Sequence, residues 1–276
     1  MASADATDPQ AFREFEHQGW QHAAGAYHDF WQELTRQAVE PLLDALAVTA
    51  EAELLDVACG PGYVAAAAAK RGARATGVDF SDVMVKTAAQ LYPKLEFREG
   101  DAENLPFAAE SFSAVAINFG MLHFSRPERA LSEAYRVLRS GGRVAYTVWT
   151  SPAEAKGFDM VLGAIEAHGT LKVAAPPGPP FFRFSDPDAA RSVLREAGFA
   201  DPSVTQVAQT WRFASAADFF AAFYGGTVRT GSLLRAQAAP ALAAIRRAII
   251  EAVKSYERAG RIEIPMPAVL ATARKP

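Results

Sequence analysis

Two glycines and two carboxylates lie close together early in the chain, in a pattern that could bind a nucleoside cofactor. The apolar run from Leu54 contains Asp56 and leads into a turn with Gly60 and Gly62. Glycine lets the backbone approach a ligand closely, because no Cβ intervenes. A second apolar run ends at Asp79, whose carboxylate could accept hydrogen bonds from both hydroxyls of a ribose. We therefore predict an adenosine-bearing cofactor across the carboxyl ends of the first two strands.

The glycines alone leave the kind of cofactor open. Gly60, Gly62 and Ala65 fit the loose dinucleotide pattern G-x-G-x-x-G/A, which would suit an NAD(P)-dependent oxidoreductase. Asp56 favours another cofactor, because its carboxylate would repel a pyrophosphate and attract the ammonium and sulfonium of S-adenosylmethionine (SAM). The sequence also lacks the Tyr-x-x-x-Lys pair of short-chain hydride-transfer enzymes. A non-catalytic SAM-binding protein is the third possibility.

Four motifs in order match one known family. They are Asp56-x-x-x-Gly60-x-Gly62, Val78-Asp79-Phe80-Ser81, Gly100-Asp101-Ala102-Glu103-x-Leu105-Pro106-Phe107 and Tyr135-Arg136-Val137-Leu138-Arg139-Ser140-Gly141-Gly142-Arg143. With them, residues 50–150 resemble the class I SAM-dependent methyltransferases, and among these the type 11 group related to ubiquinone and menaquinone biosynthesis enzymes. The chain departs from the family at Ala58, where glycine is commoner, and at Ser140, where proline is commoner.

The resemblance implies a set of cofactor-binding residues. The glycines would line the methionine part of SAM, Asp79 the ribose, and Asp101 with Ala102 the adenine. Asp79 could instead cap a helix, and Asp101 could simply close a turn. Phe80 and Met84 could flank the adenine or could equally be core residues. The implied set is Tyr27, Asp56, Gly60, Gly62, Asp79, Phe80, Met84, Asp101, Ala102 and Asn118.

The methyl acceptor is expected to be a small molecule. Methyl transfer from a sulfonium is an in-line displacement that leaves S-adenosylhomocysteine, and it needs alignment more than conspicuous catalytic groups. His123 follows the fourth predicted strand and is the candidate general base, although it could equally be a surface or core histidine. Aromatic side chains predict a pocket for a neutral or mildly polar ring-sized molecule, with ordinary packing as the alternative. The predicted pocket residues are Trp20, Trp31, His123, Trp149, Phe182, Arg183 and Tyr224.

These residues need a scaffold of alternating strands and helices. Strands are predicted over 53–57, 74–78, 95–99, 112–118 and 142–147, with a helix over 128–138 and two late strands. Such alternation favours a Rossmann-like α/β fold, in which a seven-stranded, mostly parallel sheet has an antiparallel last strand. The predicted parts are an N-terminal helical cap (1–48), the SAM-binding core (49–214 and 261–276) and a helical insertion or lid (215–260).

Composition narrows the class further. The net charge of −3 gives no basic face for nucleic acid, and the histidines show no paired metal-ligand spacing, so neither partner is expected. The single cysteine, Cys59, forms no intramolecular disulfide, and it could pack in the turn or react as a thiol. No run of about 20 apolar residues is long enough to span a bilayer, and the amino-terminal residues lack a signal-peptide pattern. We expect a cytoplasmic enzyme of unspecified oligomeric state.

Overall fold

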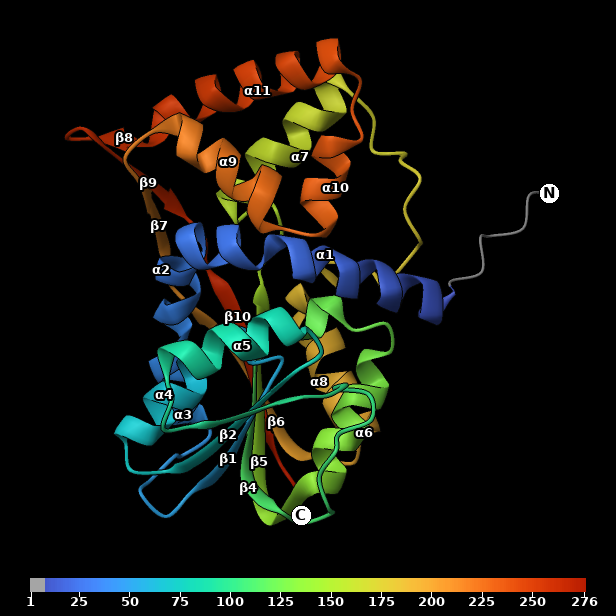
Figure 1. Cartoon of the computed structure of the whole chain (residues 1–276), viewed down its shortest axis with the longest axis vertical. Helices are drawn as coiled ribbons and strands as arrows, with labels where there is room; N and C mark the ends of the chain where they lie inside the picture. Colours follow the sequence, from blue (N-terminus) through green and yellow to red (C-terminus); the bar gives the residue numbers. More distant parts are fainter. Residues whose placement is uncertain (1–7) are drawn as a thin grey trace. The chain divides into compact units, whose positions relative to one another are not determined.

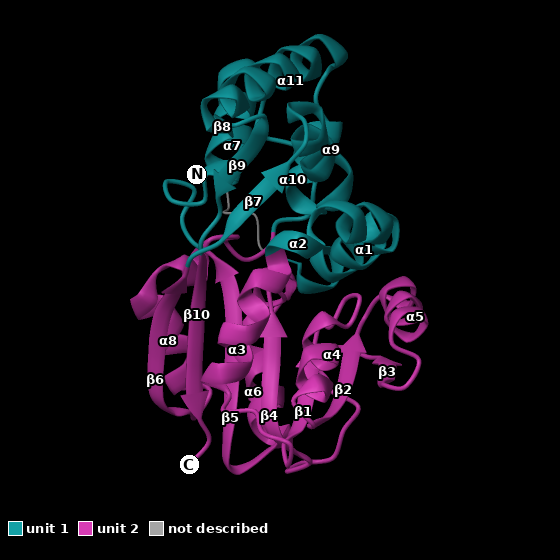
Figure 2. Cartoon of the chain, turned by 90° about the vertical axis from the view of Figure 1, so that its left-hand side faces the viewer, with its two compact units in different colours: residues 1–34, 150–177, 208–267 teal, residues 35–149, 178–207, 268–276 magenta. Residues whose placement is uncertain are grey.

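The computed structural model describes residues 8–276, and they form two compact units (Figure 2). Unit 1 contains the described residues up to 34, residues 150–177 and residues 208–267. Unit 2 contains residues 35–149, 178–207 and 268–276. The chain therefore passes between the units several times, and neither unit is a single stretch of sequence.

Unit 2 is built on a seven-stranded sheet with the order β3-β2-β1-β4-β5-β10-β6. The strands are β1 (Glu53–Val57), β2 (Arg74–Asp79), β3 (Glu96–Glu99), β4 (Phe112–Asn118), β5 (Leu138–Trp149), β6 (Ala200–Val207) and β10 (Ala268–Arg274). Strand β10 runs antiparallel to both of its neighbours, β5 and β6, while β1 to β5 pair in parallel. The predicted Rossmann-like α/β sheet with an antiparallel last strand is confirmed.

Helices cover both faces of this sheet. They are α3 (Val39–Ala45), α4 (Tyr63–Lys70), α5 (Asp82–Leu91), α6 (Pro127–Val137) and α8 (Pro187–Glu196), with short 3₁₀ turns η1 (Arg36–Ala38), η2 (Met121–His123) and η3 (Arg183–Ser185). Figure 1 shows α3 and α4 on one side of the sheet and α6 and α8 on the other. Leu42 and Leu43 of α3 pack with Leu54 of β1 and Ala116 of β4 in a cluster that excludes water. This core fixes the strand ends on which the predicted cofactor residues lie.

Local sequence signals explain where several of these helices begin. Ser81 caps α5 by accepting a hydrogen bond from the backbone N–H of Met84, and Asp186 caps α8 in the same way. Pro127 occupies the first position of α6, where its missing N–H leaves no hydrogen bond unmade. The chain leaves α6 directly into β5, and Gly141 lies inside that strand with a φ of 79°.

Unit 1 combines helices with a small second sheet. The helices are α1 (Pro9–Phe30), α2 (Gln32–Thr35), α7 (Lys156–His168), α9 (Ala216–Gly226), α10 (Arg229–Arg235) and α11 (Ala239–Val253), followed by the 3₁₀ turn η4 (Lys254–Tyr256). The sheet has the order β7-β9-β8, formed by β7 (Thr210–Phe213), β8 (Glu257–Arg258) and β9 (Arg261–Pro265). Its core is aromatic, because the rings of Trp31, Trp211 and Phe223 contact one another.

The division into units differs from the predicted boundaries. The alternating pattern over 204–213 predicts one strand, but the chain forms β6 and then β7, which belong to different sheets. Helix α7 and strand β9 also belong to unit 1, and α3 belongs to unit 2. Periodicity identifies a strand but does not say which sheet it joins, because pairing depends on contacts far apart in sequence.

Candidate functional site

Asp79 fixes the glycine turn at the carboxyl ends of β1 and β2. Its Oδ2 accepts a hydrogen bond from the backbone N–H of Gly60 at 2.8 Å, and its Oδ1 accepts one from Ser81 at 2.9 Å. Ser81 rather than Asp79 caps α5, so the alternative role as a helix cap does not apply. The carboxylate is 6% exposed and contacts the turn directly. Binding of a ribose by Asp79 stays a prediction.

Asp56 is a buried acid beneath the same turn. Its side chain is 1% exposed, and its Oδ2 accepts a hydrogen bond from the backbone N–H of Ala65 at 3.0 Å. Its Oδ1 is buried and accepts no hydrogen bond from any residue between 8 and 276. Burial raises the pKa of Asp56 to about 8, and the negative charge of Asp79 adds to this effect. A buried oxygen without a donor is a place where a cationic ligand would gain most.

Gly60 and Gly62 suit the turn for different structural reasons. Gly60 has a φ of 50°, and an added Cβ would meet no described atom within 4 Å. Its backbone therefore faces open space that a ligand could approach. Gly62 has a φ of 82°, and a Cβ there would lie 2.6 Å from the ring of Phe97 in β3. Gly62 thus allows the turn to pack against the sheet.

Two of the non-glycine residues with a positive φ lie just after two adjacent strands. Ala58, after β1, has a φ of 53°, and Phe119, after β4, has a φ of 58°. A left-handed conformation costs a residue with a Cβ about 1–2 kcal/mol. The turn keeps its shape despite alanine in place of the commoner glycine. Such strain is often kept where a protein binds a ligand.

The loop that is predicted to contact adenine follows β3, and two acidic side chains accept hydrogen bonds from its backbone. Asp101 closes a turn, because its Oδ1 accepts a hydrogen bond from the backbone N–H of Glu103 at 2.9 Å. Ala102 is 8% exposed. Glu133 of α6 accepts a hydrogen bond from the backbone N–H of Leu105 at 2.9 Å. The loop is therefore positioned by its own turn and by α6, and its contact with adenine stays a prediction.

Phe80, Met84 and Asn118 border the same strand ends. Phe80 is half-buried, whereas Met84, a residue of α5, is 3% exposed. The side chain of Asn118 donates to the carbonyl of Thr35 at 3.2 Å and accepts from Thr147 Oγ1 at 2.7 Å. Because that amide is used within the fold, the backbone carbonyl of Asn118 is the better candidate for a cofactor contact.

His123 lies at the end of η2, beside the predicted acceptor residues of unit 2. Its ring centre is 6.2 Å from that of Phe181 in an edge-on arrangement, and Phe181 contacts Phe182 in turn. Arg183 forms an ion pair with Glu128, so its charge is already balanced within the fold. We therefore expect a weaker role for Arg183 in fixing a polar group than the sequence suggests.

Two tryptophans predicted in the acceptor pocket are core residues in this structure. Trp149 is 4% exposed, and its ring stacks on Phe119 with centres 4.1 Å apart. Trp31 is 2% exposed, and its Nε1 donates to the carbonyl of Ala222 at 2.9 Å. An aromatic stripe can serve a core or a pocket equally. Both tryptophans pack in the core of their unit, and their role at the acceptor stays a prediction.

The remaining predicted residues of unit 1 are more accessible. Tyr27 and Trp20 of α1 are half-buried, and their rings meet edge to face with centres 5.3 Å apart. Tyr224 of α9 is also half-buried and stacks on Phe220. Their roles at the cofactor or acceptor stay predictions.

Arg36 and Cys59 also lie next to the turn. The guanidinium carbon of Arg36 is 5.3 Å from the ring centre of Tyr63, which directly follows Gly62. The sequence gave no local signal for Arg36, because the contact joins residues 27 positions apart. Burial raises the pKa of the Cys59 thiol well above its usual range, with smaller contributions from Asp56 and Asp79. A buried, protonated thiol favours the packing role for Cys59.

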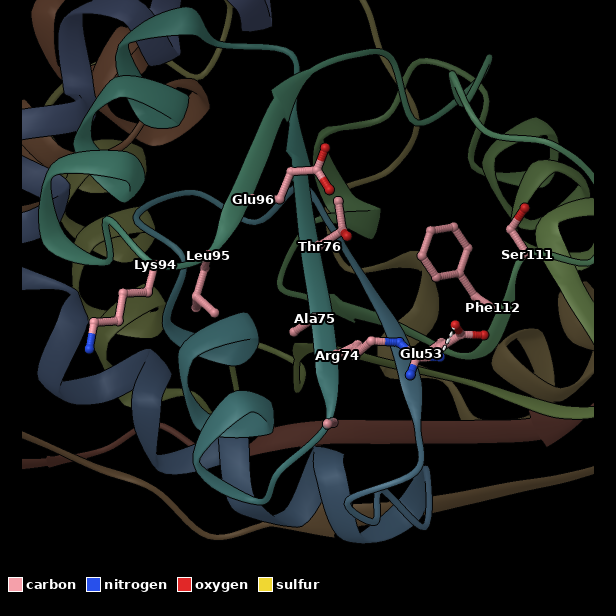
Figure 3. Close-up of a pocket in the computed structure, with 10 residues that line it drawn as sticks. Glu53, Arg74, Ala75, Thr76, Lys94, Leu95, Glu96, Ser111 and Phe112 are labelled. Atoms are coloured by element: carbon pink, nitrogen blue, oxygen red, sulfur yellow. Dashed lines mark hydrogen bonds and ion pairs between the residues drawn. The ribbon is translucent and has the colours of Figure 1, made fainter.

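A separate cavity lies at the amino-terminal ends of strands β1 to β4. Figure 3 shows this space of about 380 Å³, which is lined by the first residues of β1 to β4: Glu53, Arg74, Glu96 and Phe112. Because the glycine turn follows the other end of β1, this cavity is not part of the predicted cofactor site. The acceptor cavity predicted beside His123 stays a prediction.

Comparison with known proteins identifies the family. The family described as "Methyltransferase domain" matches residues 55–146, which run from β1 into β5. A demethylmenaquinone methyltransferase of Clavibacter sepedonicus is 31% identical over 183 residues, which cover 62% of this chain and 71% of the relative. The chain belongs to the class I SAM-dependent methyltransferases of the UbiE-like type. It is accordingly a methyltransferase whose cofactor is SAM.

Other similar proteins support the same placement to different extents. The ubiquinone/menaquinone biosynthesis C-methyltransferase UbiE of Roseobacter denitrificans is 33% identical over 58% of this chain and 71% of its own length. Other demethylmenaquinone methyltransferases match over only 39% to 50% of their length. The solved [4+2]-cyclase SpnF is 20% identical, with a TM-score of 0.61 over 96% of this chain and 97% of that one. Since SpnF is named a cyclase, likeness to it shows the fold alone.

Within residues 8–276, no helix is both long enough and apolar enough to cross a membrane.

Proposed function

We propose that the enzyme transfers the methyl group of SAM, by in-line displacement, to a small ring-shaped acceptor. The observation that carries the cofactor site is the buried Oδ1 of Asp56, which accepts no hydrogen bond from described residues, beneath a turn whose Gly60 is open. This cradle fits a cationic methionine head group better than a pyrophosphate, because a cation favours the ionised form of Asp56 and that form would repel a pyrophosphate. SAM supplies an activated methyl group when bound; the residues below hold and orient it.

Different residues of unit 2 would bind different parts of the cofactor. Asp56 would offer its oxygen to the ammonium, and Arg36, beside Tyr63, would bind the methionine carboxylate. Asp79 would accept hydrogen bonds from the ribose while it holds the N–H of Gly60. Asp101 and Ala102, with Phe80 and Met84 beside them, would contact the adenine. Holding the cofactor at several points aligns the reacting atoms, which supplies much of the acceleration.

The acceptor is proposed to be a reduced quinone-type ring. The two relatives above are named for demethylmenaquinone and for ubiquinone or menaquinone biosynthesis. In unit 2, the ring of His123 contacts the ring of Phe181, which in turn contacts Phe182, so the histidine has aromatic neighbours. His123 would remove the proton that the acceptor must lose when its carbon or oxygen takes the methyl group. Tyr27, Trp20 and Tyr224 remain proposed contacts.

The test is methyl transfer from labelled SAM to demethylated naphthoquinols, followed by mass spectrometry. We expect labelled product with the wild type and a loss of about 10²–10⁴-fold in rate with His123→Gln, the range that general base catalysis supplies. His168→Gln is the matched control, because His168 ends α7 in unit 1, and it should keep the wild-type rate. Wild-type rates in His123→Gln would contradict the base. No methyl transfer to any quinol would contradict the acceptor class.

A further inference from the structure

Glu103 is a buried acid that joins two loops at the carboxyl ends of the strands. Glu103 is only 4% exposed, and it directly follows Ala102 of the proposed adenine subsite. On that side, the backbone N–H of Glu103 donates to Asp101 Oδ1. On the other side, Glu103 Oε1 accepts hydrogen bonds from Ser125 Oγ at 2.7 Å and from the backbone N–H of Arg126 at 2.8 Å.

The second loop is the one that follows His123. Ser125 and Arg126 stand two and three positions after His123, between η2 and α6. Arg126 is the N-cap residue of α6, and its own side chain makes no cap hydrogen bond. Glu103 therefore supplies the acceptor at this helix start, where a negative charge is also favoured by the helix dipole. Its Oε2 accepts a further hydrogen bond from Arg126 Nε at 2.8 Å.

These contacts make the two loops mechanically dependent on each other. A shift of Asp101 or Ala102 would move the backbone of Glu103, and the carboxylate would move Arg126 with it. Three hydrogen bonds to one buried carboxylate are costly to break singly, because each loss leaves part of the charge unsatisfied. These hydrogen bonds therefore pass a small displacement of one loop on to the other loop.

We propose that Glu103 is a positioning residue that couples occupation of the adenine subsite to the placement of His123. The proposal rests on the cofactor site proposed above. When the adenine side of the cofactor orders the loop that carries Ala102, Glu103 holds the segment after His123 in the matching position. The base is then aligned only when the cofactor is bound.

Glu133 provides a matched control for this proposal. It is similarly buried, at 7% exposure, and it also binds the adenine loop, through the N–H of Leu105. Its other partner is Arg136, one turn further along α6, which also donates to the carbonyls of Leu105 and Phe107. Glu133 thus steadies the same loop but has no hydrogen bond to the segment after His123.

The experiment follows the His123 ring by nuclear magnetic resonance of ¹³C-labelled histidine, with S-adenosylhomocysteine as the probe. The His123 signal is assigned with His123→Gln, and each variant is measured at saturating ligand, as checked by calorimetry. We expect the ligand to shift the His123 signal in the wild type and in Glu133→Ala. In Glu103→Ala most of that shift should be lost. Glu103→Gln should keep much of it, because its carbonyl oxygen can still accept from Ser125 and Arg126.

The outcomes separate this proposal from the cofactor site itself. If the wild type does not bind S-adenosylhomocysteine, the proposed cofactor site fails. If the wild type binds it, the coupling is overturned by an unchanged His123 signal, by a full shift in Glu103→Ala, or by equal losses in Glu103→Ala and Glu133→Ala. Should Glu103→Ala not fold, the double variant Ser125→Ala/Arg126→Ala decides. A reduced shift there supports the coupling, and a full shift overturns it.

Discussion

Asp56 is a residue whose burial works against the stability of the fold. Its pKa is about 8 in the folded chain, because the carboxyl group is buried, whereas an unfolded aspartate has a pKa near 3.8. Between these two values the folded chain holds one proton more than the unfolded chain. The free energy of unfolding therefore falls as the pH rises from about 4 to about 8. We infer that this cost is kept because the carboxylate binds the cationic cofactor.

Asp56→Asn should therefore stabilise the protein in a pH-dependent way. The amide has nearly the same shape and no charge to bury. We expect the free energy of unfolding at pH 8 to rise by about 2–4 kcal/mol, and to change little at about pH 3, where the wild-type carboxyl is mostly protonated in both states. Urea unfolding at the two pH values measures this. Equal effects at both pH values would show that ionisation of Asp56 is not the cause.

The same substitution should weaken cofactor binding. Removing a charged partner from the ammonium should lower SAM affinity at least about tenfold, since such hydrogen bonds contribute about 1.5–3 kcal/mol. In the wild type, the affinity should rise between pH 6 and about 8 as Asp56 loses its proton. Calorimetry across this range provides the measurement. Asp56→Asn should lose most of that dependence, and an identical pH profile in both proteins would exclude Asp56 as the titrating group.

Ala58→Gly tests the strain in the turn. Glycine adopts the φ of 53° found there without penalty, although it also makes the unfolded chain more flexible. We expect a net gain in stability of up to about 1 kcal/mol. Ala69→Gly is the control, because Ala69 lies in α4, where glycine should cost about 1 kcal/mol. A loss of stability in Ala58→Gly as large as that in the control would show that the alanine is not strained.

The sequence predicts the position of candidate site residues well where the chain places them locally. Gly60 and Asp79 stand at strand ends, so their neighbourhood could be inferred from the two strands alone. The sequence gave no signal for Arg36, because its approach to Tyr63 depends on how η1 packs beside the turn. The burial of Trp31 among other rings could not be predicted, because nothing in a helical stripe distinguishes a ring that faces other rings from one that faces a ligand.

At the scale of elements, α1 shows how a glycine can serve packing instead of breaking a helix. Gly19 and Gly25 lie within α1, and the helix runs unbroken from Pro9 to Phe30. A Cβ on Gly19 would lie 2.3 Å from Val228 Cγ1, just before α10. Gly19 therefore allows the close approach of these segments. A Cβ on Gly25 would meet no described atom within 4 Å.

The two glycines of α1 should respond to alanine in opposite directions. Gly25→Ala should stabilise the protein by about 0.5–1 kcal/mol, because alanine favours the helix and has room. Gly19→Ala should destabilise it by about 1–3 kcal/mol, because the new methyl group must displace Val228. Thermal unfolding of both variants measures the contrast. Similar stabilisation by both substitutions would mean that the segments do not pack as closely as described.

Strand prediction failed at the point where one sheet ends and another begins. Alternation over 204–213 is continuous in the sequence, yet β6 pairs with β10 and β7 pairs with β9. Gln209 lies between them, with its backbone carbonyl accepting from Met266 and its side chain donating to Leu34. These partners are distant in sequence, so no local pattern could announce the change of sheet.

In the molecule as a whole, the parallel sheet could be predicted from the sequence, because the strands of unit 2 alternate with helices along the chain. Right-handed crossovers fix the hand of these connections, whereas the strand order comes from the structure. Unit 1 is assembled from three separate stretches, and what unites them is an aromatic core that includes Trp31, Phe158 and Trp211. Which stretches share a core is a property of the fold and not of any one stretch.

Calorimetric titration tests whether the carboxyl ends of β1 and β2 hold SAM. S-adenosylhomocysteine, SAM and NAD are each titrated into the wild type and into Gly60→Val, whose side chain would occupy the open space beside the turn and strain its left-handed backbone. We predict that the wild type binds both adenosyl ligands and not NAD, and that Gly60→Val loses at least about tenfold in affinity for both. Binding of NAD alone, or unchanged affinity in Gly60→Val, would show that SAM does not bind at these strand ends.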